Sequence, residues 1–136
     1  MSNVFTRFRH PTGLEFWDNA VEIGKLLVRF AMNEKNIPKR YAFLFAHPLI
    51  AKYQEMRDAI VEANSIYPTN EHELMLRKDA QQRAICLNEE IIQRLQDTLE
   101  ILPHIDADKL DELGERLPKE STLLRGWRNS SKIMRT

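Results

Sequence analysis

The chain has little glycine, a single cysteine and no long apolar run. Only four glycines occur among 136 residues, and a β-rich domain of this size would need more turns, so an all-α fold is favoured. No apolar run approaches the roughly 20 residues that span a bilayer. The segment MSNVFTRFRH lacks the apolar core of a secretory signal. Because Cys86 has no second cysteine to pair with, we expect a reducing, cytoplasmic location.

The net charge of the chain is zero, but the charge is unevenly spread. Residues 1–45 carry +3 and residues 118–136 carry +4, whereas residues 67–101 and residues 102–117 carry −3 each. A long-range attraction for nucleic acid needs a basic field. Any such field is therefore local here, or is built by assembling several copies of the chain.

A first helix is predicted over about residues 13–33, after a flexible arm over residues 1–12. Thr12 and Glu15 fit a capping box at its start. Two apolar rows then advance by four and three residues, the spacing of a helix face. They are Phe16, Ala20, Ile23, Leu27 and Phe30, and Trp17, Val21, Gly24, Val28 and Ala31. Two adjacent rows exceed the demand of one bundle and predict self-association.

A second helix is predicted to open at Ile37-Pro38, since a proline costs nothing at the first helical position. It ends near residue 66. Pro48 either kinks this helix, or begins a separate one after a short helix over 39–46. Beyond Pro48 the helical spacing continues with Leu49, Tyr53, Met56, Ile60 and Ala63.

Two more helices complete the predicted fold. Asn70 caps a helix over about 71–101, whose apolar row is Ala80, Ala84, Leu87, Ile91, Leu95 and Leu99. Asp106 caps a fourth helix, which Pro118 is expected to interrupt before a frayed tail over 131–136. Short connections between long helices favour antiparallel neighbours. The prediction is one domain over 13–130, an all-α, antiparallel up-down-up-down four-helix bundle with the second helix kinked or broken near Pro48.

Few side chains are arranged for catalysis or for metal binding. The four histidines, His10, His47, His72 and His104, lie far apart and pair with no Cys or carboxylate at helical spacing. Cys86 lies between Ile85 and Leu87 and is expected to be a buried, inert thiol. No glycine-rich phosphate loop occurs. We therefore expect no enzyme activity, no metal and no cofactor.

Basic clusters are the candidates for phosphate contact, and solvated helix faces are the alternative interpretation. In the predicted bundle, one end holds Arg77, Lys78, Arg125 and Arg128, and the other end holds Lys39 and Arg40. Lys132 belongs to the same C-terminal cluster as Arg128. The candidate nucleic-acid-binding residues are Lys39, Arg40, Arg77, Lys78, Arg83, Arg125 and Arg128.

Aromatic residues are the candidates for an oligomer interface. Tyr41, Phe43 and Phe45 alternate two apart, so on a helix they cannot all point into one core. Either one of them is core and the others cover a neighbouring element, or they form a subunit interface, where aromatics are enriched. The predicted interface residues are Trp17, Tyr41, Phe43, Phe45 and Trp127.

Several features follow one another along the chain: Trp17 in the first helix, Ile37-Pro38-Lys39-Arg40-Tyr41-x-Phe43, Glu62-Ala63-Asn64, Arg77, and Gly126-Trp127. Their order, over residues 14–130, resembles the accessory variability determinant family of diversity-generating retroelements. It is similar also to the four-helix proteins encoded in 23S rRNA intervening sequences. The resemblance marks Lys39, Arg40, Arg77 and Gly126-Trp127, whereas the neutral charge, Pro48 and Pro118 depart from the family.

The resemblance implies a homopentameric four-helix bundle without a catalytic residue of its own. It also implies binding to a reverse transcriptase and its RNA or cDNA. A non-enzymatic accessory protein of a diversity-generating retroelement, or of a similar mobile element, is therefore our first functional hypothesis. The rival is a protein–protein scaffold or regulator that makes no nucleic-acid contact.

Overall fold

A computed structural model describes residues 14–134 of the chain. This part contains four α-helices and no strand, so the predicted all-α, four-helix fold is confirmed. The predicted flexible arm over residues 1–12 lies outside the described residues. The elements are α2 (Glu15–Met32), the short 3₁₀ helix η1 (Lys39–Tyr41), α3 (Ala46–Ser65), α4 (Glu71–Ile101), the 3₁₀ helix η2 (Ala107–Leu110) and α5 (Asp111–Ser130).

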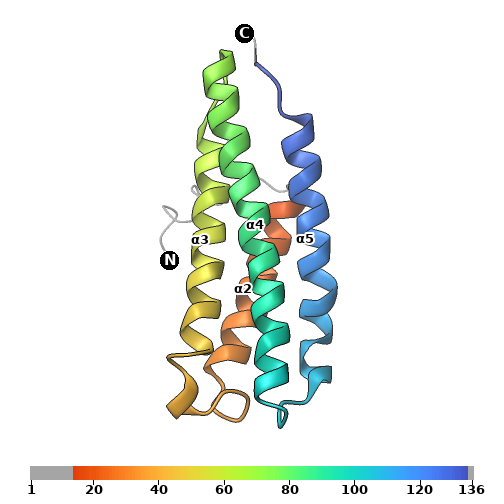
Figure 1. Cartoon of the computed structure of the whole chain (residues 1–136). Helices are drawn as coiled ribbons and strands as arrows, with labels where there is room; N and C mark the ends of the chain where they lie inside the picture. The colour runs from red at the N-terminus through yellow and green to blue at the C-terminus, as the bar shows by residue number, and fades with distance from the viewer. Residues whose placement is uncertain (1–13, 135–136) are drawn as a thin grey trace, which may run out of the picture.

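The four helices lie side by side, and consecutive helices run in opposite directions (Figure 1). Helix α4 packs between α3 and α5, and α2 packs against α3 and α5 on the other side. With 31 residues, α4 is much longer than α2, which has 18 and begins part-way along the bundle (Figure 1). We call the end where α4 begins and α5 finishes the Glu71 end, and the opposite end the Ile101 end.

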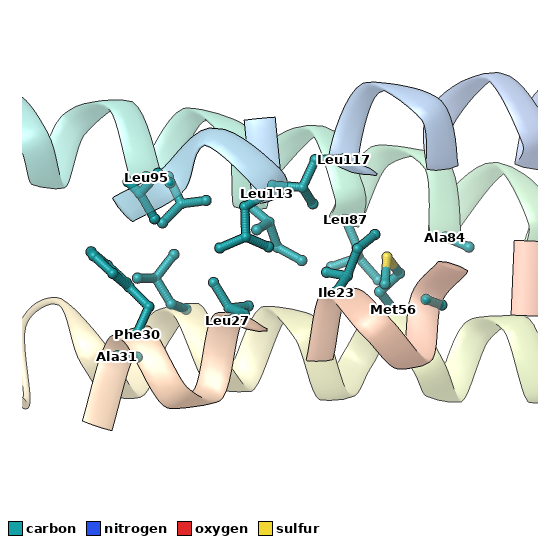
Figure 2. Close-up of a cluster of buried hydrophobic side chains, with 14 of the residues drawn as sticks. Ile23, Leu27, Phe30, Ala31, Met56, Ala84, Leu87, Leu95, Leu113 and Leu117 are labelled. Atoms are coloured by element: carbon teal, nitrogen blue, oxygen red, sulfur yellow. The ribbon is translucent and has the colours of Figure 1, made fainter. Parts of the chain in front are cut away.

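The core is built from the apolar rows expected from the sequence. Figure 2 shows part of it, with side chains of all four helices meeting between the ribbons. Ile23, Leu27 and Ile91 have no accessible surface. The second apolar row of α2 is partly buried by the same chain, because the ring of Tyr53 covers Gly24. Burying such side chains is the main favourable term in the stability of the fold.

The predicted cap of α4 is confirmed, whereas the predicted cap of the fourth helix belongs to the 3₁₀ helix that precedes it. The Asn70 side chain accepts a hydrogen bond from the Glu73 N–H at 2.9 Å and caps α4 as predicted. Helix α2 begins after Leu14, which provides no side-chain cap, and Thr12 lies outside the described residues. Asp106 accepts from the Asp108 N–H and so caps η2, while α5 begins only at Asp111.

The chain between residues 37 and 46 is not one α-helix. After Pro38 a single 3₁₀ turn forms, followed by hydrogen-bonded turns, and α3 starts at Ala46. Pro48 therefore falls in the first turn of α3, where backbone N–H groups have no helical acceptor. A missing N–H at this position costs little.

The prediction that Pro118 interrupts the fourth helix is wrong, because α5 continues from Asp111 to Ser130 with Pro118 inside it. A proline within a helix leaves the carbonyl four residues earlier without its N–H partner, here that of Gly114. Gly114 is exposed and has open space beside it, so that carbonyl remains accessible to water. Buried Leu113 and Leu124 hold the two halves of the helix against the core.

Helix α5 ends at Ser130, at the predicted boundary, and the residues beyond it are held against the bundle. The Met134 N–H donates to the Pro68 carbonyl at 2.7 Å, and Gln81 Nε2 donates to Ser131 Oγ at 2.8 Å. Fraying of residues 131–134 away from the bundle is therefore not observed. The described chain ends against the loop that connects α3 and α4.

Candidate nucleic-acid interface

Cross-helix hydrogen bonds set the register between α4 and α5 near the Glu71 end. Arg128 donates to Gln82 Oε1, and Gln81 bonds Ser131. The two helices are antiparallel (Figure 1). Lys78 lies one turn before Gln82 on α4, and Lys132 follows Ser131, two residues after the end of α5. These two lysines and Arg128 form a group that we call the basic patch.

None of the three cations of the basic patch is neutralised by a carboxylate among the described residues. The guanidinium of Arg128 is held by the amide oxygens of Gln82 and Asn129, which carry no net charge. Lys132 is exposed and Lys78 is half-buried, and neither forms an ion pair among the described residues. The basic patch can therefore offer positive charge to an incoming phosphate.

Two of the predicted nucleic-acid residues are already paired with carboxylates. Arg125 lies 3.1 Å from Glu89 on the α4–α5 face, beside the basic patch. Arg83 pairs with Glu62 across α3 and α4, on a different face of the bundle. Both pairs are exposed, and exposed pairs contribute only about 0–1 kcal/mol, so Arg125 remains free to exchange its partner.

Arg77 is part of the interior of the Glu71 end. Its Nη1 donates to the Ile66 carbonyl at 2.9 Å, and its guanidinium lies 5.6 Å from the ring centroid of Trp127. Burial lowers the pKa of Arg77. Trp127 in turn stacks on Phe16 with ring centroids 4.2 Å apart. These contacts tie three helices to the α3–α4 loop and explain both residues without a ligand.

Lys39 and Arg40 lie at the Ile101 end, far along the bundle from the basic patch (Figure 1). Both are exposed, and the Arg40 guanidinium stacks 4.9 Å from the Tyr41 ring centroid. Phe43 is 77% exposed and contacts His47 edge-on. The seven candidate cations therefore do not form one surface.

The predicted interface aromatics differ in their surroundings. Tyr41 and Phe45 are half-buried and contact each other edge to face at 6.4 Å. Trp17 is half-buried, with Arg57 4.6 Å from its ring centroid. Trp127 is packed inside the Glu71 end. Of the five, Phe43 alone presents most of its side chain to solvent.

The thiol of Cys86 is exposed, which corrects the expectation that it is buried. On α4 the inward positions include Ala84, Ile85, Leu87 and Asn88. Cys86 lies between these positions but faces outward, because each residue turns the helix by about 100°. Its Sγ is 3.5 Å from the Gln82 amide nitrogen.

A buried polar cluster between α2 and α5 was missed by the sequence analysis. Glu120 has no accessible surface, and its Oε1 accepts a hydrogen bond from Asn19 Nδ2 at 3.0 Å. Arg116 joins the cluster by donating to Asn19 Oδ1 at 3.1 Å. Burial raises the pKa of Glu120 to about 8 against the opposing effects of Asn19, Arg57 and Lys119. The signal was present, since Leu113, Leu117, Glu120 and Leu124 have the four-three-four spacing of an inward row.

The described residues thus define an all-α, four-helix protein with a basic patch at one end. They contain no group of three or more His, Cys, Asp or Glu residues placed to hold a metal ion. None of the described helices is both long enough and apolar enough to cross a membrane. Comparisons with family models, with curated proteins and with solved structures find no match.

Proposed function

We propose that this chain is a non-catalytic accessory protein of a diversity-generating retroelement or a similar mobile element. An oligomer of the bundle would hold structured RNA, or an RNA–cDNA hybrid, beside a reverse transcriptase in the cytoplasm. The resemblance noted over residues 14–130 supports this proposal, as does the four-helix fold. The observation that carries it is the basic patch, in which Arg128 is held by neutral partners and neither Lys78 nor Lys132 forms an ion pair among the described residues.

The strength of RNA binding depends on the number of phosphates that each copy contacts. Each phosphate contact releases counterions, so affinity falls with salt by a log–log slope of about 0.7 per contact on a single strand. The basic patch supplies three cations, while the chain as a whole is neutral. Binding by one copy is therefore weak. An oligomer repeats the patch, and linked weak contacts gain avidity.

The test replaces Lys78, Arg128 and Lys132 together by Gln and measures retention on a structured RNA by fluorescence anisotropy at low and high salt. The expected result is a large loss of binding and a shallower salt dependence, with the oligomeric mass unchanged. Arg83→Gln is the matched control, because it removes a cation that is paired with Glu62 on another face. Retention by the triple variant equal to that of the wild type contradicts the assignment.

A protein–protein scaffold is the second candidate function. It is favoured by the fact that Arg77, Arg83 and Arg125 are engaged within the chain, which leaves few cations for phosphate. On this alternative the wild-type protein binds a protein partner and shows no RNA retention even at low salt. The same anisotropy measurement therefore separates the two functions before any variant is made.

A further inference from the structure

An apolar groove runs between α4 and α5 toward the Ile101 end. Its volume is about 300 Å³, and apolar side chains form most of its wall. The lining residues are Ile92, Leu95, Gln96, Leu99, Leu110, Leu113, Gly114, Leu117 and Pro118. A groove of this volume accommodates one or two large side chains of a partner, whose burial would add apolar contact.

Gly114 and Pro118 open the α5 side of this groove. A Cβ atom added at Gly114 meets no atom within 4 Å, so the missing side chain leaves space at the groove wall. The Gly114 carbonyl has no helical donor, because residue 118 is a proline. The groove therefore combines an apolar wall with an unused backbone acceptor.

The edges of the groove are acidic. Glu100 lies one helical turn beyond Gln96 on α4, and Asp111 and Glu115 lie on the outer side of the lining row of α5. All three are exposed. Residues 93–117 carry three Lys/Arg and seven Asp/Glu, a net charge of −4. A partner that fits this groove carries an apolar side chain flanked by cations.

Such a segment exists at the Ile101 end of the same chain. Phe43 and Leu44 are 77% and 61% exposed, and both follow the exposed cations Lys39 and Arg40. Residues 33–47 carry three Lys/Arg and one Glu, a net charge of +2. This segment is held in shape by η1 and by the turns that follow it, so little conformational entropy is lost when it binds.

We propose that residues 39–45 of one copy dock into the α4–α5 groove of a second copy, with Phe43 or Leu44 entering the groove and the cations facing its acidic edges. The contact joins two different surfaces, so each copy keeps one groove and one segment for further neighbours. Repeated contacts of this kind close into a ring when the rotation permits. The inference rests on the self-association in the proposed function, and it leaves the basic patch at the Glu71 end open.

The first experiment fills the groove from within by Gly114→Leu and measures mass by light scattering at micromolar concentrations. The wild type is expected at a multiple of 16.0 kDa and the variant at 16.0 kDa. Gly126→Leu is the matched control, since Gly126 lies on the same helix and also has no atom within 4 Å of an added Cβ. Both variants should keep the helical circular dichroism of the wild type at the assay temperature, which shows that monomer formation is not unfolding.

A cross-linking experiment identifies the contact itself. In a Cys86→Ser background, protein with Phe43→Cys is mixed with protein carrying Gly114→Cys, and the mixture is oxidised. A disulfide-linked dimer of the two variants is expected, and mixing Phe43→Cys with Gly126→Cys should give none. The proposal is overturned if Gly114→Leu keeps the wild-type mass, if the wild type is itself a monomer, or if the two mixtures cross-link equally.

These results are independent of the RNA assignment. Binding that is lost on replacing Lys78, Arg128 and Lys132, together with an unchanged mass for Gly114→Leu, retains the proposed function and moves the interface elsewhere. A monomeric Gly114→Leu variant of a protein that never binds RNA retains the docking surface and rejects the proposed function.

Discussion

Asn19 on α2 and Glu120 on α5 are joined by a hydrogen bond of 3.0 Å inside the core. The Asn19 amide also donates to the Arg116 carbonyl at 2.9 Å, so it fixes α2 against α5 at two points. The second carboxyl oxygen of Glu120 is buried without a hydrogen-bond partner in the described structure. An unpaired buried carboxylate is costly, which agrees with a Glu120 pKa raised to about 8, mainly by burial.

The first prediction concerns the pH dependence of stability. The folded chain keeps the Glu120 proton up to about pH 8, whereas the unfolded chain releases it near its ordinary pKa of 4.5. Between these values the folded state binds one more proton, so this residue lowers the free energy of unfolding as pH rises, by about 1.4 kcal/mol per unit. Below pH 4.5 and above about pH 8 its contribution is flat.

Glu120→Gln removes this titration while keeping the acceptor for Asn19. The variant should gain stability over the wild type as pH rises from 5 to 8, as measured by urea unfolding at fixed protein concentration. Glu55→Gln, an exposed change on α3 away from the α4–α5 groove, is the control and should follow the wild type. Parallel curves for Glu120→Gln and the wild type over that range would contradict a proton held at Glu120.

A second prediction concerns the close contact between α2 and α3 at Gly24. A Cβ added there would lie 2.2 Å from the Tyr53 hydroxyl oxygen, which bonds the Ala20 carbonyl at 3.0 Å. Gly24→Ala should therefore displace Tyr53 and lower the free energy of unfolding by about 1–3 kcal/mol. The control Gly126→Ala meets no atom within 4 Å and should raise stability by about 0.5–1 kcal/mol. Equal stability of the two alanine variants would refute the steric role of Gly24.

The helices could be predicted because inward positions repeat at a fixed spacing, as in Ala80, Ala84, Leu87 and Ile91, which are all buried. The same spacing also marks Glu120 as inward and Cys86 as outward. The sequence analysis missed the burial of Glu120 and wrongly buried Cys86 because it gave residue type more weight than position on the helix. The break before Ala46 depends on how the turn packs, which local propensity does not determine.

The ion-pair partners of the candidate cations could not be predicted from the sequence. Spacing within one helix predicts pairs three or four residues apart, such as Arg116 with Glu112. Arg125 with Glu89, and Arg83 with Glu62, join different helices and depend on their register and rotation. That register decides which of the candidate cations on α4 and α5 are paired with carboxylates and which are not.

A third prediction distinguishes the structural role of Arg77 from the phosphate-binding role of Lys78. Arg77→Gln loses the bond to the Ile66 carbonyl and the contact with Trp127, and should lower the free energy of unfolding by about 1–2 kcal/mol. RNA retention by the folded oligomer should not change. Lys78→Gln should show the reverse, with weaker retention and unchanged stability. Thermal melts and RNA anisotropy on the same preparations measure the stability and the RNA retention of each variant. If Arg77→Gln keeps its full stability but retains RNA more weakly, Arg77 contacts phosphate after all.

The last prediction compares two prolines at different positions in their helices. Pro118 lies inside α5, so Pro118→Ala restores an N–H donor to the Gly114 carbonyl and removes the clash of the ring. The free energy of unfolding should rise by about 1–3 kcal/mol. Pro48 lies in the first turn of α3, where no helical acceptor awaits its N–H, so Pro48→Ala should change stability by less than about 0.5 kcal/mol. Urea unfolding at one protein concentration measures both variants, because self-association also affects apparent stability. A gain for Pro48→Ala without one for Pro118→Ala would mean that the chain is strained at the start of α3 instead of within α5.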